Sequence, residues 1–183
     1  MSLVTLREAT IEDLQTLKYW DEQPHVKESG QDDDWNWEVE LLKNHSWREF
    51  LMAELNGTPI GFIQVIDPAP EETHYWGEIA DGYRAIDIWI VELTNIGKGY
   101  GRAMMHQALA RCFRNADVHS VLIDPLSSNV RAIRFYERLG FTFVEDRRFD
   151  DDDCKVYVMT RSAWQKICDM ESDPKSHAQL KMT

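Results

Sequence analysis

The sequence predicts a single α+β domain in which helices flank a mixed, mostly antiparallel central sheet. The chain has 183 residues, which suits one domain, and 43% of them are hydrophobic, which is enough to form a core. Strand-like and helix-like segments follow one another without an internal repeat, and hairpin patterns occur in both halves. We expect the domain to cover residues 1–183, with a core over about 3–161 and a polar C-terminal tail over 165–183.

The first part of the chain is expected to begin with a strand and a helix. Residues 3–10 alternate between apolar and polar like a strand. Thr10 followed by Asp13 is typical of a helix start. Apolar residues then recur at helical spacing, namely Leu14, Leu17 and Trp20. Residues 25–38 are polar and acidic and predict a loop, and residues 38–44 predict a helical turn.

The middle of the chain predicts three strands. Residues 47–66 form the clearest hairpin, with two apolar runs around Asn56-Gly57, a dipeptide that readily takes the positive φ of a tight turn. A polar loop over 67–78 follows. Residues 83–92 are rich in β-branched and aromatic side chains and predict a central strand.

A glycine-rich segment then precedes a helix and a strand. Residues 102–113 place Met105, Ala108, Leu109 and Cys112 on one helical face. Residues 118–125 predict a strand that Pro125 ends.

The last part predicts a helix and a hairpin. Asn129 can cap a helix over 130–139, and Gly140 can close it. Its apolar stripe consists of Ala132, Phe135, Tyr136 and Leu139. A final hairpin over 141–149 and 155–164 is expected around an acidic run, Asp150 to Asp153.

The net charge of the chain limits the classes of partner that we expect. It has 32 acidic and 20 basic side chains and a net charge of −12. Nucleic acid is not expected as a partner, because binding it needs clustered Lys and Arg. A negative field attracts cations, including small polyamines, although acidity alone also serves solubility.

The composition also suggests where the protein works. No apolar run is long enough to span a membrane, and the N-terminus lacks the pattern of a secretory signal. The three cysteines are an odd number without metal-ligand spacing, and the six histidines are scattered, so we expect no metal. These features favour a reduced, cytoplasmic setting.

The glycine-rich segment carries three glycines at alternate positions, Gly97, Gly99 and Gly101, between a predicted strand and a predicted helix. Backbone N–H groups at such a helix start can bind a phosphate, and glycines let the backbone approach it. The Gly-Lys-Ser/Thr of a Walker A loop is absent, and the spacing and position do not fit a Rossmann motif. A phosphate site and a plain glycine-rich turn both remain open on this motif alone.

A second motif gives the first a context. Asn129, Ala132, Tyr136, Gly140 and Phe141 form the pattern N-x-x-A-x-x-x-Y-x-x-x-G-F. With Gly99 and Gly101 before it, this resembles motifs A and B of the GNAT superfamily of acetyl-CoA-dependent N-acetyltransferases, over residues 3–161. The resemblance implies a sheet splayed at an acetyl-CoA site. One position departs from the family pattern, since Ile96 stands where the family usually has Gln or Arg.

Within that superfamily the chain looks most like the aminoglycoside 6′-N-acetyltransferases, which are antibiotic-resistance enzymes. The shared segments are "NGTPIGFIQ", "YRAIDIWI", "IGKGYGRAM" and "IDPLSSNVRAIRFYERLGF". They carry Asp87 and Asp124, which match acidic active-site positions of those enzymes. The resemblance therefore implies acetyl transfer from acetyl-CoA to the 6′-amine of an aminoglycoside, in a monomer or weak homodimer.

The resemblance also implies roles for the catalytic residues. Asp124 or Asp87 would hold the incoming ammonium and accept its proton, and Tyr136 would protonate the leaving thiolate. On the residues alone, Asp124 could be a turn acid and Tyr136 a core residue, whereas a buried Asp87 without a partner would be costly. The cysteines show no activating base, so direct attack in a ternary complex is expected.

The expected cofactor contacts lie on one strand and in both motifs. Backbone N–H groups near Ile88, Trp89 and Ile90 would stabilise the oxyanion. The pyrophosphate would be held by the backbone of Lys98, Gly99, Tyr100, Gly101 and Arg102. Asn129 is expected to bond the pantetheine arm, to cap its helix, or both.

The acceptor pocket is expected to come from loops. Carboxylates and flat aromatic faces suit a polycationic sugar. The candidates are Trp35, Trp37, Glu78, Asp81, Asp87 and Asp124, together with the run Asp32 to Asp34. Other acceptors remain open, namely a polyamine, a siderophore hydroxylamine or a protein N-terminus. A non-catalytic acyl-CoA-binding module is a further alternative.

Overall fold

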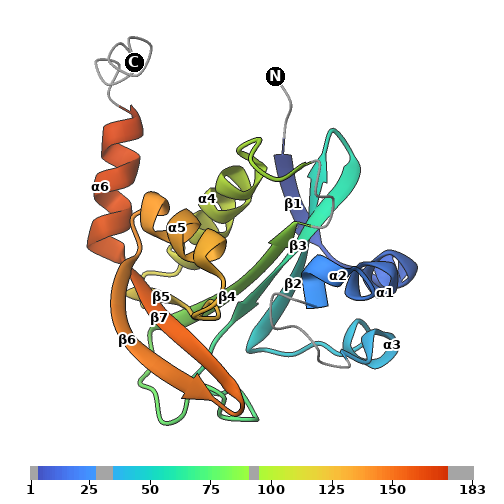
Figure 1. Ribbon diagram of the computed structural model, residues 1–183, viewed down its shortest axis with the longest axis horizontal. Helices are drawn as coiled ribbons and strands as arrows, with labels where there is room; N and C mark the ends of the chain where they lie inside the picture. The colour runs from blue at the N-terminus through green and yellow to red at the C-terminus, as the bar shows by residue number, and fades with distance from the viewer. Residues whose placement is uncertain (1–3, 28–34, 91–94, 173–183) are drawn as a thin grey trace.

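The computed structural model describes residues 4–27, 35–90 and 95–172, and its centre is one mixed sheet (Figure 1). The seven strands lie in the order β1-β2-β3-β4-β5-β7-β6, and all pair antiparallel except β4 with β5. The strands are β1 (Val4–Glu8), β2 (Arg48–Leu55), β3 (Thr58–Ile66), β4 (Tyr83–Ile90), β5 (Ser120–Ile123), β6 (Thr142–Phe149) and β7 (Asp152–Thr160). The predicted fold class is therefore confirmed.

Helices α1, α2 and α3 lie on one side of the sheet, α4 and α5 lie on the other, and α6 follows the last strand (Figure 1). They are the 3-10 turn η1 (Ile11–Asp13), α1 (Leu14–Asp21), α2 (Pro24–Lys27), α3 (Trp37–Glu40), α4 (Tyr100–Cys112), α5 (Val130–Leu139) and α6 (Arg161–Ser172). Within the three described ranges, no helix combines the length and the apolar character needed to cross a membrane.

Strands β2, β3 and β4 carry a different core on each face. Along β2, the side chains of Leu51 and Ala53 join the main core with α4 and α5, whereas Met52 between them packs with α1, α2 and α3. This alternation follows the period of two along a strand. The same period places Ile88 of β4 against the main core and Trp89 in the second one.

The predicted turn and cap residues adopt the conformations that their positions require. Asn56 and Gly57 both have positive φ, 52° and 82°, and join β2 to β3. Thr10 caps η1, because its hydroxyl accepts from the N–H of Glu12 and its own N–H donates to the carboxylate of Asp13. These reciprocal bonds satisfy donors that the start of a helix leaves unpaired.

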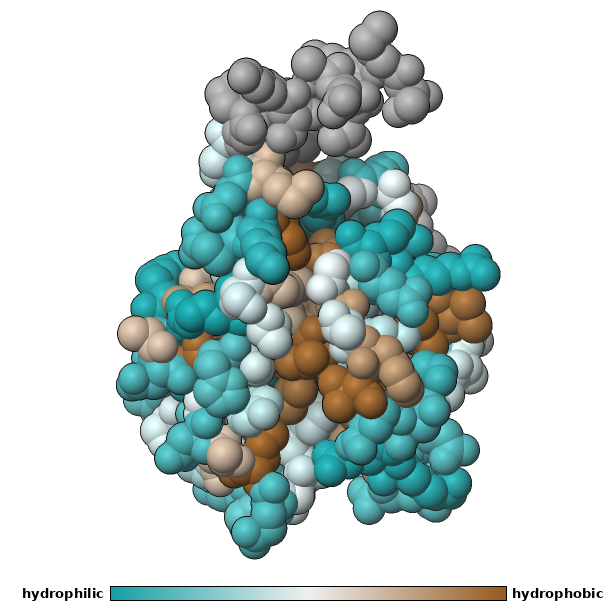
Figure 2. Space-filling view, turned by 90° about the vertical axis from the view of Figure 1, so that its left-hand side faces the viewer, coloured by the Kyte–Doolittle hydropathy of each residue, from teal (hydrophilic) through white to brown (hydrophobic). Residues whose placement is uncertain are grey.

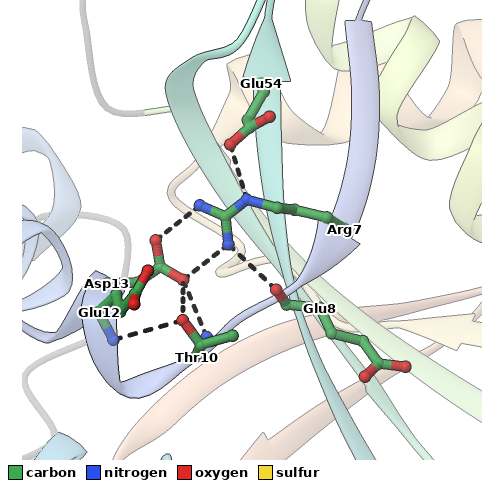
Figure 3. A network of polar contacts seen from close by, with 6 residues as sticks. All are labelled: Arg7, Glu8, Thr10, Glu12, Asp13 and Glu54. Carbon is green, nitrogen blue, oxygen red and sulfur yellow. Dashed lines mark hydrogen bonds and ion pairs between the residues drawn. The ribbon is translucent and has the colours of Figure 1, made fainter.

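The same Asp13 anchors β1 to the helix that follows it (Figure 3). Two nitrogens of the Arg7 guanidinium donate to the two oxygens of Asp13 at 2.7 Å each, and its Nε donates to Glu54 at 2.7 Å. Asp13 is buried. Burial raises the pKa of Asp13, but the hydrogen bonds from Arg7 and Thr10 outweigh that effect and hold it below its usual value.

We expect Arg7→Met to destabilise the protein at neutral pH by about 2 kcal/mol, because it leaves Asp13 buried without its cation. This is below the range for a fully buried pair, since the side chain of Arg7 is 39% exposed. A carboxyl with a depressed folded-state pKa stabilises the fold above its unfolded pKa, and that stability is lost as the pH falls through the folded value. The deficit should therefore shrink in acid. Urea denaturation at neutral and acidic pH measures it.

The control for that variant is Arg148→Met, which removes a cation paired only with exposed carboxylates of the last hairpin. It should change the free energy of unfolding by less than about 0.5 kcal/mol. A deficit in Arg7→Met that did not depend on pH would contradict the assigned role of Asp13.

Two predictions of secondary structure are wrong. The expected loop over 25–38 contains most of α2 and the start of α3, in which Val26 and Trp37 are buried against the second core. The expected strand over 155–164 ends at Thr160, and α6 follows, reaching into the segment predicted as tail. Trp164 is buried in the main core, with Ile167 and Cys168 packed against it at helical spacing, which the prediction overlooked.

The last hairpin also turns more tightly than predicted. Asp152 to Cys154 belong to β7, because they pair with Phe149 to Arg147 of β6. Only two residues remain at the tip, where Asp150 has φ 45°. Residue 3, residues 91–92 of the predicted strand and 173–183 of the predicted tail lie outside the described residues.

An apolar band lies on the side of the molecule that carries α6 and β6. Figure 2 shows this side, with apolar side chains gathered between larger hydrophilic areas. Phe143 and Val144 of β6 and Val130 of α5 are among the exposed apolar residues. The edge strand β6 also carries four charges, Glu145 to Arg148, and a register shift beside Val144. Charges and bulges of this kind disfavour pairing with another sheet edge.

Candidate active site

The main cleft, about 440 Å³, lies between β4, α4 and α5. Its apolar wall includes Ile88 and Ile90 of β4 and Phe135 of α5. Arg102, Arg131 and Arg138 lie at its polar parts. A cleft with apolar walls and a few cations suits a long ligand that has an apolar arm and anionic groups.

The cleft exists because two parallel strands separate. β4 and β5 pair from Tyr83 and Ser120 to Ala85 and Leu122. Beyond Ala85, β4 continues to Ile90 beside β3. The N–H groups of this part of β4 that point away from β3 are therefore turned toward the opening, where they can donate to a ligand.

The start of α4 forms one end of the cleft. Gly99 is its N-cap residue, with φ 84°, and its carbonyl accepts the first helical bond, from the N–H of Ala103 at 3.2 Å. The N–H groups of Tyr100, Gly101 and Arg102 come before that bond, at the positive end of the helix dipole. A Cβ on Gly101 would lie only 3.2 Å from Ile90 and 3.3 Å from Phe135, so glycine keeps the wall open here. This end is built to receive an anion.

The start of α5 forms the opposite wall. Asn129 caps the helix, because its Oδ1 accepts from the N–H of Ala132 at 3.1 Å. Asn129 and Tyr136 both line the cleft, one at each end of two helical turns. The predicted cap is thus confirmed, and the same side chain is available to a ligand.

Two aspartates lie where β4 and β5 separate. Asp87 lies two residues beyond Ala85, and Asp124 lies two residues beyond Leu122, which is the last pair in register. The period of two puts both carboxylates on the same face of the sheet. Gln64, only 4% exposed on the neighbouring β3, donates to Asp87 Oδ2 at 2.8 Å. This hydrogen bond offsets part of the cost of placing the carboxylate of Asp87 in the middle of a strand.

Asp124 has a different partner. The hydroxyl of Tyr75, in the loop between β3 and β4, donates to its Oδ2 at 2.7 Å. Burial raises the pKa of Asp124 above its usual value, although the hydrogen bond from Tyr75 and the charge of Arg147 act in the other direction. A carboxylate with a raised pKa is a stronger proton acceptor than an exposed one.

Tyr136 is buried on α5 close to both aspartates. Burial raises the pKa of its phenol, and the negative charges of Asp87 and Asp124 raise it further. The phenol therefore keeps its proton at neutral pH and can donate a hydrogen bond or a proton. Cys112 and Cys154 also keep their protons, because burial raises each pKa to about 12.

Comparison with known proteins identifies the architecture. Residues 10–149 match the model of the acetyltransferase (GNAT) domain family. The chain is 31% identical to the aminoglycoside N(6′)-acetyltransferase type 1 of Klebsiella pneumoniae, over 89% of this chain and 86% of that protein. The chain belongs to the GNAT acetyltransferase family.

Solved structures agree with that membership. The aminoglycoside acetyltransferase AAC(6′)-Ib in complex with coenzyme A and kanamycin superimposes with a TM-score of 0.81 at 29% identity, over 90% of this chain and 98% of that one. A spermidine N-acetyltransferase chimera from Vibrio cholerae superimposes with a TM-score of 0.69, over 88% of this chain and 98% of that one. Its identity is 19%, so it shows the shared fold alone.

In this GNAT domain most residues predicted to contact the cofactor share the cleft. They are Ile88, Trp89, Ile90, Gly99, Gly101, Arg102, Asn129 and Tyr136. Lys98 is exposed and Tyr100 packs against the main core, and neither side chain lines the cleft. Any contact from these two would come from the backbone, as the prediction for this segment states.

The residues predicted for the acceptor pocket do not all converge. Trp37 is only 2% exposed and sits in the second core, where Trp35 stacks on it at 5.2 Å. Trp37 therefore packs against Trp35 and leaves little of its own surface for contact with a substrate. Asp81 is exposed two residues before β4, beside His119 and six residues from Asp87, or about 20 Å along a strand. The structure therefore does not bring Asp81 together with Asp87.

The remaining acceptor candidates were predicted to lie in loops. Glu78 is exposed in the loop before β4. The run 32–34 lies outside the described residues. In the part of the chain that the structure describes, no group of three or more His, Cys, Asp and Glu side chains is placed to hold a metal ion.

Sequence reasoning missed several residues at the site. Gln64 and Tyr75 hold the two aspartates, and Arg131 and Arg138 line the cleft. Gln64 carried one signal, since it is a polar residue inside an otherwise apolar strand. Arg131 and Arg138 are seven residues apart, and this spacing puts them on the same side of α5.

Proposed function

We propose that this protein transfers the acetyl group of acetyl-CoA to a primary amine of an aminoglycoside, specifically the 6′-amine. The observation that carries the proposal is the placement of Asp87 and Asp124 on one face of the sheet where β4 leaves β5, with both charges acting on Tyr136. Both positions adjoin the end of the cleft that Ile88 and Tyr136 line. The relatives named aminoglycoside acetyltransferases, one of them with coenzyme A and kanamycin bound, support the choice of donor and acceptor.

The cleft fits acetyl-CoA as the donor. The start of α4 and the nearby Arg102, Arg131 and Arg138 would receive its phosphates. The apolar wall of Ile88, Ile90 and Phe135 would pack along the pantetheine arm. When bound there, acetyl-CoA supplies a thioester whose carbonyl carbon accepts the amine nitrogen.

The aspartates would receive the acceptor. An alkylammonium is attracted by two carboxylates, but it must lose a proton before the nitrogen can attack. Asp124 takes that proton, directly or through water, and Asp87 holds the cation in place. N–H groups of β4 near Trp89 that face the opening stabilise the oxyanion of the tetrahedral intermediate.

Tyr136 would complete the reaction. The C–S bond breaks as the intermediate collapses, and the sulfur leaves with the electron pair. The neutral phenol of Tyr136 stabilises the thiolate by a hydrogen bond or protonates it. Cys112 and Cys154 remain thiols at neutral pH, which disfavours an acetyl-cysteine intermediate and supports direct transfer.

The net charge of −12 favours a polycationic acceptor over a neutral one. We also propose that the protein acts as a monomer or weak homodimer in the cytoplasm, and the charged edge strand β6 supports that oligomeric state.

An acceptor panel tests the proposal. Acetyl-CoA is incubated with the protein and kanamycin, spermidine, hydroxylysine or a short peptide, and release of free thiol is followed. Kanamycin should give the highest kcat/KM. Thiol release with another amine but not with kanamycin would reject the aminoglycoside, while binding of acetyl-CoA without release for any amine would favour a non-catalytic module.

A further inference from the structure

The loop between β3 and β4 sends one side chain onto the proposed proton acceptor. The Tyr75 hydroxyl lies 2.7 Å from Asp124 Oδ2, across 49 positions of the chain. We propose that Tyr75 is a positioning residue, which fixes the Asp124 carboxylate through Oδ2 and leaves Oδ1 to receive the amine. This inference rests on the role proposed for Asp124.

The backbone of the loop is fixed where Tyr75 leaves it. Glu71 is only 5% exposed, and its two oxygens accept from the N–H of Thr73 at 2.7 Å and the N–H of Tyr75 at 3.0 Å. Burial raises the pKa of Glu71, but these hydrogen bonds outweigh it and keep the carboxylate ionised at neutral pH. A buried carboxylate that serves two amides of one turn locks the turn that presents Tyr75.

The ring of Tyr75 is held as well. It stacks on Phe149 with centroids 4.4 Å apart and planes 6° apart, and it meets Trp76 edge-on at 5.9 Å. Phe149 and Trp76 are both buried. With the ring held on two sides, the hydroxyl loses little freedom when it bonds to Asp124. Buried neighbours therefore hold Tyr75 in the position of this hydrogen bond, although Tyr75 itself is 45% exposed.

Several charged or titratable groups lie near Asp124. The groups that interact electrostatically with Asp124 are Arg147 of β6, Cys154 of β7, Tyr136 of α5 and Tyr75 itself, and Asp87 of β4 acts on the same two tyrosines. Cys154 and both tyrosines are neutral, because burial raises the pKa of each. Arg147 acts through its charge. Two hydrogen bonds favour the ionised carboxylate, one from Tyr75 and one from the backbone of Asp124 itself, and the bond from Tyr75 has the larger effect.

Removing the hydroxyl should therefore raise the pKa of Asp124. A smaller fraction of Asp124 is then ionised at any pH near that pKa, and the fraction recovers as the pH rises. The catalytic deficit of Tyr75→Phe should grow toward acid and vanish toward base. A purely structural role for Tyr75 would instead give a deficit that does not depend on pH.

The test uses Tyr75→Phe, because phenylalanine keeps the stack on Phe149 and removes only the hydroxyl. The control is Tyr157→Phe, which removes another tyrosine–carboxylate bond, from Tyr157 to Glu137 at 3.0 Å. Tyr157 pairs with Ile123 in the main core, so its side chain lies on the opposite face of the sheet from Asp124. Both variants are compared with the unchanged protein by carboxyl-carbon NMR titration of labelled aspartates, with the Asp124 signal assigned through Asp124→Asn. Thermal unfolding checks that each variant is folded.

The titration of Asp124 should move to higher pH in Tyr75→Phe and stay in place in Tyr157→Phe. In parallel, kcat/KM for kanamycin should fall about tenfold near pH 6 in Tyr75→Phe and approach the unchanged value near pH 9. An unmoved Asp124 titration in Tyr75→Phe would overturn the inference. Because the titration needs no turnover, failure to acetylate kanamycin would reject the proposed function separately, without being mistaken for that result.

Discussion

Replacing Asp124 with asparagine should lower kcat for acetylation of kanamycin by about 100- to 10,000-fold, the usual contribution of a general base. Asparagine preserves the shape of the side chain but cannot take a proton from the ammonium. Asp124 does not line the donor cleft, so the affinity for acetyl-CoA should stay within about twofold. Steady-state kinetics and calorimetric titration with acetyl-CoA measure the two quantities.

The matched control is Asp117→Asn, which makes the same chemical change at an exposed position between α4 and β5. Its kcat and its acetyl-CoA affinity should both be unchanged. If Asp124→Asn turned over as fast as the control, Asp124 would lose the role of proton acceptor, and Asp87 would become the candidate.

Replacing Gly99 with valine should weaken acetyl-CoA binding by about 10- to 100-fold. Gly99 has φ 84°, a conformation in which a β-branched residue is strained by about 1–3 kcal/mol. A Cβ here would meet no atom within 4 Å, so the effect would come from the backbone and not from a clash. Relief of the strain would turn the first N–H groups of α4 away from the phosphates.

Lys98→Ala is the matched control for Gly99→Val, at the neighbouring position. Lys98 is exposed and lies outside the cleft, so loss of its charge should weaken binding only about twofold. Because Ile96 replaces the usual polar side chain of the family motif, the backbone should dominate the grip. Equal losses in the two variants would contradict this account of the loop.

The parts of the site that the sequence predicted depend on local geometry. Gly99 and Asn129 mark helix starts, and such positions are set by a few neighbouring residues. Asp87 and Asp124 were both predicted for the acceptor pocket. Each lies two residues beyond the last parallel pair, which puts both on one face of the sheet.

The parts that were missed depend on tertiary packing. Tyr75 reaches Asp124 only because Glu71 folds its loop and Phe149 comes from a strand near the end of the chain. A sequence pattern does not contain that encounter. Trp37 was assigned to the acceptor pocket because it lies in a polar segment, but an aromatic side chain there gains more by entering the second core.

The errors at the C-terminus have a similar cause. The prediction extended the strand β7 through Trp164, whereas the strand ends at Thr160. The hydroxyl of Thr160 accepts a hydrogen bond from the N–H of Ala163, in the first turn of α6. A threonine cap within a polar segment is a weak signal on its own. The burial of Trp164 in the main core decides in favour of the helix.

We propose that this GNAT domain delivers acetyl from acetyl-CoA to the 6′-amine of an aminoglycoside, with Asp124 as the proton acceptor. To test this, the protein is incubated with acetyl-CoA and kanamycin, and the product is analysed by mass spectrometry and NMR. The expected product is kanamycin with one acetyl group on its 6′-nitrogen, formed in step with the release of free coenzyme A. An acetyl group on a different nitrogen, or unmodified kanamycin under conditions in which another amine is acetylated, would contradict it.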